Sequence, residues 1–115
     1  MATGRQLIVL CLLLTGLGCG PSYMYQWGEY QEMLYAAYIE PGSVDIQDEI
    51  GRLSDQVERT EQSGKLVPPG LRAHLASLLY QTGDEEGSAS LFLAEKEAFP
   101  ESAVFVDGMI ERMGR

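Results

Sequence analysis

Apolar residues recur at helical spacing along the chain, and the first such stretch lies between residues 30 and 38. They occupy positions i, i+3, i+4, i+7 and i+8, which is the spacing of one face of an α-helix. Pro41 and Gly42 follow and predict the end of this helix. We expect this face to pack into a core, and it consists of Tyr30, Met33, Leu34, Ala37 and Tyr38.

A second helix is predicted from about Ile46 to Ser63, and its apolar stripe is narrow. Ser43 or Asp45 can cap its first turn, and Gly64 is placed to cap its last turn. Charged residues cover the remaining surface, so we expect one seam of this helix to touch the core. That seam consists of Ile46, Ile50, Leu53 and Val57.

The segment from Pro68 to Ser102 forms the centre of the predicted fold. A turn at Thr82-Gly83-Asp84 divides it into two helices that fold back on each other, with Asp84 as the N-cap of the second. Pro100 prevents continuation of that second helix. The first of the two has an apolar face wide enough to need contacts on two sides, formed by Leu71, Leu75, Ala76, Leu78 and Leu79.

Two more apolar faces complete the pattern. The second hairpin helix is expected to turn Ala89, Phe92 and Leu93 inward, and Ser102 can cap a fifth helix. No stretch alternates at the period of a strand, so the sequence predicts an all-α domain of about five short helices at residues 25–115. The apolar residues of the fifth helix are Val104, Phe105, Met109, Ile110 and Met113.

The chain of 115 residues carries 17 acidic and 8 basic side chains, which gives a formal net charge of −9. Such a surface repels nucleic acid phosphates and anionic headgroups, so we expect no nucleic-acid binding and no electrostatic membrane binding. The two cysteines, Cys11 and Cys19, lie in or beside the N-terminal apolar run. A disulfide framework and a metal site are therefore not expected, and no cofactor is predicted besides a covalent lipid.

Residues 1–18 have the three parts of a secretory signal peptide. Arg5 supplies a positive charge, residues 7–14 form the apolar run, and residues 15–18 form a cleavage zone that contains small residues. The apolar run is far shorter than the ~20 residues that a bilayer-spanning helix requires. A transmembrane helix is therefore not expected.

The Gly-Leu-Gly tripeptide at 16–18, followed by Cys19, resembles the bacterial lipobox. The resemblance implies cleavage before Cys19 and a lipid on that cysteine, with residues 19–24 as lipidated cysteine and tether. Gly16 stands where the family prefers Leu, and cleavage by the ordinary signal peptidase, which would release a soluble protein, stays open. Gly20 implies sorting to the outer membrane, where we expect a lipid-anchored domain that faces the periplasm.

Tyr23, Tyr25 and Trp27 precede the first helix and lie outside its apolar stripe. Amphipathic aromatic rings are common both at membrane interfaces and at protein–protein interfaces. We therefore regard Tyr25 and Trp27 as candidate partner-binding residues.

One regularly spaced set of hairpin residues comprises Leu75-Ala76, Leu79-Tyr80, Gly83-Asp84, Phe92 and Pro100. Their spacing resembles a tetratricopeptide repeat, in which small and large residues let two antiparallel helices nest. The resemblance implies that the groove-facing residues of the first hairpin helix are candidate partner contacts, namely Ala73, Ser77, Tyr80 and Gln81.

Arg72, Ser88 and Glu95 depart from the repeat pattern, which favours apolar or small residues at these positions. One repeat cannot bury its own faces, because about three repeats are usually needed for stability. We therefore expect neighbouring helices, or a partner, to meet the hairpin at these three positions.

A longer set of motifs covers nearly all of the chain after Cys19: Tyr25-Gln26-Trp27-Gly28-x-Tyr30, Leu34-Tyr35, Pro68-Pro69-Gly70-Leu71-x-Ala73-His74-Leu75 and Glu95-Lys96-x-x-Phe99-Pro100-Glu101-Ser102. These motifs resemble a family of small bacterial lipoproteins of unknown function. Its members are often encoded beside a lipoprotein similar to the curli secretion channel. The resemblance implies a role in cell-envelope assembly with envelope proteins as partners, and it supplies no catalytic residue.

His74 is the only histidine, and no serine or cysteine lies in a nucleophile motif. An imidazole without such partners is a poor basis for catalysis, so we expect no enzyme. A small hydrolase accessory that uses His74 is the remote alternative. The leading hypothesis is a membrane-anchored interaction and assembly module, and the second is a structural subunit of an obligate envelope complex or homo-oligomer.

Overall fold

The computed structural model describes residue 20 and residues 23–114 of the chain. Within this part the helices are α2 (Tyr30–Ile39), α3 (Ile46–Gln62), α4 (Leu71–Gln81), α5 (Glu85–Ala98), the 3-10 helix η1 (Pro100–Ser102) and α6 (Ala103–Met113). No strand occurs among the described residues, where the only β-type pairing is an isolated bridge between Tyr25 and Leu66. The predicted all-α fold is confirmed.

The predicted signal peptide at residues 1–18 and the predicted lipidation site at Cys19 lie outside the described residues. None of the helices in the described part of the chain has the length and apolar character needed to cross a membrane.

Two of the predicted helix caps are confirmed by their side-chain hydrogen bonds. The Asp45 carboxylate accepts from two amides in the first turn of α3, at 2.8 and 3.4 Å. The Asp84 carboxylate accepts from the Gly87 amide at 2.9 Å. Ser102 is the N-cap residue of α6, as predicted, but its side chain makes no capping hydrogen bond. Its hydroxyl instead donates to the Phe99 carbonyl at 2.7 Å.

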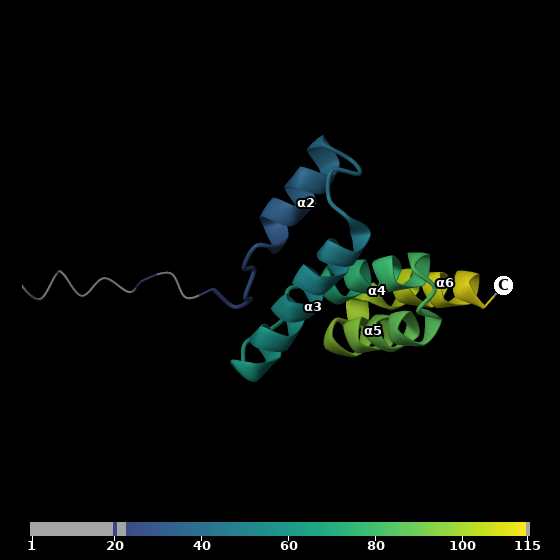
Figure 1. Cartoon of the computed structure of the whole chain (residues 1–115). Helices are drawn as coiled ribbons and strands as arrows, with labels where there is room; N and C mark the ends of the chain where they lie inside the picture. The colour runs from purple at the N-terminus through teal and green to yellow at the C-terminus, as the bar shows by residue number, and fades with distance from the viewer. Residues whose placement is uncertain (1–19, 21–22, 115) are drawn as a thin grey trace, which may run out of the picture.

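The two hairpin helices α4 and α5 lie side by side, with α3 against α4 and α6 against α5 (Figure 1). As predicted, α4 is covered on two sides. One of its faces joins a main core with α2, α3 and the loop before α4, and the other joins a second core with α5 and α6. The main core holds Tyr30, Met33, Leu53, Val57, Val67, Leu71, Leu75 and Leu78, and the second holds Ala73, Ala76, Phe92 and Val106.

The inward faces of α5 and α6 differ from the expected ones. Phe92 is fully buried, but Leu93 is 54% exposed, so the prediction for Leu93 is wrong. In α6 the buried residue is Val106, whereas Val104 is 89% exposed. The residues that α5 buries beside Phe92 are polar, namely Ser88 and Glu95.

The three polar departures from the repeat pattern contact neighbouring elements, as expected. Arg72 donates to the Glu61 carboxylate of α3 at 2.9 Å. Ser88 donates to the Met113 sulfur of α6 at 3.7 Å. Glu95 accepts from a backbone amide at the start of α4 at 2.6 Å. Each of these three departures from the repeat pattern therefore marks a contact between the hairpin and another element of the domain.

Candidate interaction surface

The candidate contacts on α4 do not form one open surface. Ala73 is 7% exposed and belongs to the second core, and the Ser77 hydroxyl donates to the Ala73 carbonyl at 2.9 Å. Tyr80 is 38% exposed, and the exposed Gln81 amide donates to the Ser77 carbonyl at 3.2 Å. Only the outer pair, Tyr80 and Gln81, is therefore placed to touch a partner without rearrangement.

The aromatic residues before α2 pack against the domain. The backbone N–H of Gln26 donates to the Leu66 carbonyl at 3.0 Å, and this bond holds the extended segment against the loop before α4. The half-buried Tyr25 ring lies 6.2 Å from the Trp27 ring and 6.0 Å from the Phe99 ring, measured between centroids. Trp27 also packs against the main core. Both candidate residues therefore have contacts within the chain, which leaves only part of each ring for a partner.

Helix α2, whose apolar face was predicted to pack into the core, has four exposed apolar or aromatic side chains. Only Tyr30 and Met33, in its first half, are buried. Leu34 and Tyr38 of the predicted buried face are 42% and 84% exposed, so the prediction is wrong for these two residues. They lie beside two further exposed residues on one side of the helix, and we call this set the arm face: Leu34, Tyr35, Tyr38 and Ile39.

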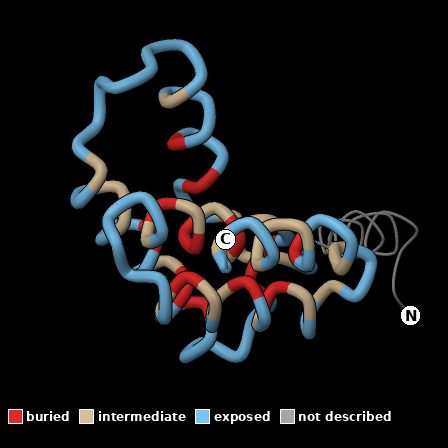
Figure 2. Tube along the Cα trace, turned by 90° about the vertical axis from the view of Figure 1, so that its right-hand side faces the viewer, coloured by how far each residue is buried: buried red, intermediate tan, exposed pale blue. Residues whose placement is uncertain are grey.

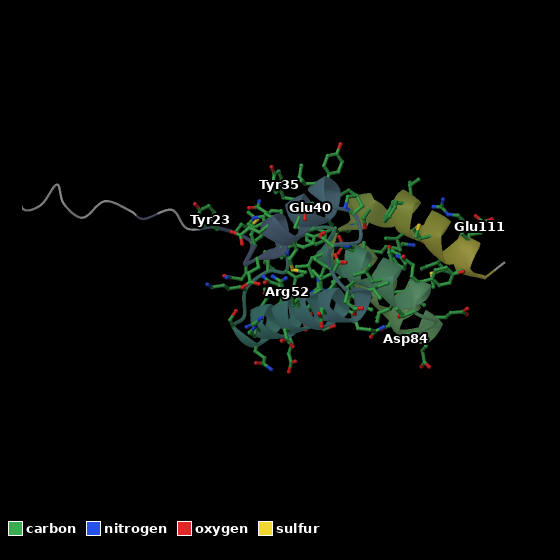
Figure 3. The ribbon with its side chains drawn as sticks, turned by 45° about the horizontal axis from the view of Figure 1, so that its top comes forward. Tyr23, Tyr35, Glu40, Arg52, Asp84 and Glu111 are labelled. Carbon is green, nitrogen blue, oxygen red and sulfur yellow. The ribbon has the colours of Figure 1, made fainter. Side chains whose placement is uncertain are left out.

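The position of α2 explains this exposure. The helix and the loop that follows it, residues 30–45, project beyond the group formed by α4, α5 and α6, and we call this projection the arm (Figures 1 and 2). Figure 2 shows exposed residues along most of this projection, whereas the buried residues gather in the lower part of the domain. Tyr35 points away from the domain (Figure 3). The rest of the described chain therefore covers the start of α2 but not its second half.

A cavity of about 210 Å³ separates α2 from the start of α3, and we call it the slot. On α2 the slot is lined by the buried Met33 and by the small side chains of Ala36 and Ala37. Val44, in the connecting loop, also lines it. The charged lining residues are Glu32, Glu49 and Arg52.

The sequence of this domain matches a known protein family. Residues 24–109 match a family described as Domain of unknown function (DUF4810). The chain belongs to the DUF4810 family. No curated protein and no solved structure matches the chain. The matched region runs from Met24 into α6, so the arm face, the slot and the hairpin are all parts of the DUF4810 domain.

The arm of the DUF4810 domain lies in an acidic environment. Arg52 is the only basic residue between positions 23 and 58, and it donates to the Glu29 carboxylate at 2.8 Å. The hydrogen bond and charge of Arg52 lower the pKa of Glu29. Figure 3 shows Arg52 on the side of α3 that faces α2. Among the described residues, Glu32 and Glu40 form no ion pair, so the arm face has an anionic border.

Four polar side chains, one each from α2, α3, α4 and α5, lie near one another at the base of the arm: Tyr30, Glu49, His74 and Glu95. His74 lies 3.3 Å from the Glu49 carboxylate through Nε2, and its ring centroid is 6.0 Å from that of Tyr30. Burial, followed by the nearby charges of Glu95 and Glu49, raises the pKa of Tyr30 to about 12. Burial lowers the pKa of His74, and the Glu49 charge opposes this shift only in part. These groups join the arm to the hairpin.

The same junction shows how His74 is placed. Its Nδ1 atom is buried and has no hydrogen-bond partner among the described residues, and Nε2 faces Glu49. The imidazole is thus enclosed between helices. In the described part of the chain, no group of three or more His, Cys, Asp or Glu side chains could hold a metal ion.

Proposed function

We propose that this chain is a lipid-anchored module of the bacterial cell envelope that binds a partner protein through its arm face, and that it is not an enzyme. The observation that supports the proposal is the second half of α2, where Leu34, Tyr35, Tyr38 and Ile39 remain exposed on one helix. A helix that is apolar around most of its circumference normally lies inside a protein. A large exposed apolar surface of this kind marks an interaction site.

A short tether would keep this surface near the membrane. Tyr23 is four positions after Cys19, and a fully extended chain spans about 3.3–3.6 Å per residue, or at most about 14 Å over this distance. A lipid on Cys19 would therefore hold the domain at the surface of the outer membrane, on the periplasmic side. Partners in the same envelope are within reach of the arm.

The partner's chemistry follows from the surroundings of the arm face. Interfacial membrane helices carry Lys and Arg on their polar faces, whereas α2 carries neither. A second copy would bring a second acidic border against Glu32 and Glu40. A different protein, with an apolar patch bordered by Lys or Arg, fits the arm face better than a lipid surface or a second copy.

The family resemblance suggests where such a partner is found. It implies neighbouring envelope lipoproteins, including one similar to the curli secretion channel. The separate resemblance to a tetratricopeptide repeat implies a partner groove on the α4–α5 hairpin, with Tyr80 and Gln81 at the edge of the contact. The alternative to a reversible module is a structural subunit of an obligate envelope complex or homo-oligomer, whose permanent interface would use the same arm face.

Site-specific photo-crosslinking in intact cells tests the proposal. The full chain carries the crosslinker at Tyr35 or, as a matched control, at Val104, which is 89% exposed on α6. We expect one defined crosslinked protein from Tyr35 and none from Val104, and loss of the Tyr35 product when Cys19→Ser removes the anchor. Equal crosslinking from both positions, or none from Tyr35, would contradict the proposal.

Size measurement separates the two forms of the proposal. Sedimentation of the purified chain that lacks the lipid should give a monomer if the arm binds its partner reversibly. An oligomer that persists on dilution would favour the structural subunit instead.

A further inference from the structure

The slot between α2 and α3 is separate from the arm face and has its own chemistry. We infer that it receives one large apolar side chain of a partner protein, flanked in the partner's sequence by Lys or Arg. This inference rests on the proposed function, because it assigns a second contact to the same partner. Three features of the slot carry it: its size, its lining and the charge that remains free at its mouth.

The size of the slot matches one side chain. An apolar cavity of about 150 Å³ binds a single benzene molecule, and the slot measures about 210 Å³. It therefore has room for the side chain of one phenylalanine, leucine or methionine, and not for a helix or a lipid tail. Ala36 and Ala37 leave this space open because each ends at its β-carbon.

The lining favours an apolar group. Four of its seven lining residues are apolar, namely Met33, which is 8% exposed, Ala36, Ala37 and Val44. A side chain that enters would exchange water for these carbon atoms, which contributes about 25 cal/mol per Å² of apolar surface removed from water. Single apolar side chains in such pockets commonly dominate the affinity of an interface.

The charged residues around the slot set the preference for neighbouring cations. Glu49 faces His74 at 3.3 Å, and Arg52 pairs with Glu29 at 2.8 Å, so both already have partners. Glu32 has no ion-pair partner among the described residues and is exposed. A Lys or Arg next to the inserted side chain would meet Glu32, whereas a carboxylate there would be repelled.

Three capped tripeptides test the inference directly: Lys-Phe-Lys, Glu-Phe-Glu and Lys-Ala-Lys, each added to the methyl-labelled domain and followed by NMR. We expect Lys-Phe-Lys to shift the methyl signals of Met33, Ala36, Ala37 and Val44. Glu-Phe-Glu should bind about threefold more weakly, since an exposed ion pair contributes little. Lys-Ala-Lys should leave these signals unmoved.

Two variants make the test specific to the slot. Ala36→Leu fills the space with a residue that favours helix, so it should abolish the Lys-Phe-Lys shifts while the fold persists. Glu32→Lys should reverse the preference so that Glu-Phe-Glu binds more tightly. Shifts that occur elsewhere, or equal binding of all three peptides, would overturn the inference.

The two proposals fail separately. If Tyr35 crosslinks to a partner and Lys-Phe-Lys leaves the slot signals unmoved, the slot assignment is wrong and the arm face stands. If the slot binds Lys-Phe-Lys with the expected preference and Tyr35 gives no crosslink, the arm-face proposal is wrong and the slot stands as a binding site.

Discussion

Replacement of Glu95 by alanine should destabilise the domain through the start of α4. The Glu95 side chain is 2% exposed and accepts from the Gly70 amide at 2.6 Å. Gly70 is the N-cap of α4 and has no side chain to cap the helix itself, so a carboxylate from α5 supplies the acceptor. The loss of one partner of a partly buried hydrogen bond costs about 1–3 kcal/mol, and we expect a decrease of about 2 kcal/mol in the free energy of unfolding.

Glu95→Gln is the matched control, because it keeps an acceptor oxygen and removes the charge. The second carboxylate oxygen, Oε2, is buried without a hydrogen-bond partner among the described residues. Removal of a poorly compensated buried charge offsets part of any lost hydrogen-bond strength, so this variant should lose less than about 1 kcal/mol. The pKa of Tyr30 should fall from about 12, because the Glu95 charge helps to raise it, and should stay above 10.0 because burial remains.

Urea unfolding followed by the fluorescence of Trp27, the only tryptophan, measures both stabilities. NMR titration of labelled tyrosine measures the pKa of Tyr30. A free energy of unfolding for Glu95→Ala within about 0.5 kcal/mol of the parent value, which is the range of neutral surface changes, would refute the role of Glu95 at the start of α4. An unchanged Tyr30 pKa in Glu95→Gln would refute the contribution of the Glu95 charge.

Three further predictions concern the core, the junction and the arm. Phe92→Ala should lower the free energy of unfolding, measured in urea, by about 3–5 kcal/mol. Leu93→Ala, next along the helix and 54% exposed, should change it by less than about 1 kcal/mol. Similar losses in the two variants would contradict the assigned helix face. The folded-state pKa of His74 is lowered, so the stability that the residue contributes is present above the unfolded pKa of 6.5 and is lost as pH falls below it. His74→Gln should flatten this part of the profile of unfolding free energy against pH. An identical profile would contradict the lowered pKa of His74. Tyr38→Ser, at an 84% exposed position, should leave the melting temperature within about 2 °C and abolish crosslinking from Tyr35; a large stability loss would show that the ring packs within the chain.

The helices could be predicted from the sequence because local signals agreed with each other. Asp45 and Asp84 cap the helices they were expected to cap. The narrow stripe of α3 packs as predicted, with Leu53 and Val57 buried. Capping residues, turn glycines and apolar spacing act over a few residues, so they do not depend on the rest of the fold.

The inward faces of α5 and α6 could not be predicted in the same way. In α5 the buried side includes Ser88 and Glu95, whose partners come from α6 and from the start of α4. A prediction from apolar spacing assumes that polar residues are exposed, and it therefore assigned Leu93 to the buried face. The departures from the repeat pattern were the better signal, because a polar residue at a packed position needs a partner from another element.

The exposure of the second half of α2 was not predicted, because the apolar residues of this helix were all assigned to one buried face. Gln31 and Glu32 are the only residues of α2 that are neither apolar nor aromatic, so the helix is apolar on nearly every side. A small domain buries a smaller fraction of its surface than a large one, and here the cores that cover two sides of α4 reach only the first half of α2. The apolar character of α2 on nearly every side was the signal that this helix has more apolar surface than one buried face can cover.

The same features indicate how a partner would act on the arm. A helix of ten residues is marginal in water on its own, and α2 is held by Tyr30, Met33 and the Glu29–Arg52 pair, all near its start. Its second half gains little from the domain, whereas burial of a leucine- or isoleucine-sized side chain contributes about 1.5–3 kcal/mol. A partner that covers Leu34 and Ile39 would therefore stabilise the helix and the complex together. The polar junction beneath Tyr30 fixes the base of the arm, and this fixed base limits the conformational entropy that binding must overcome.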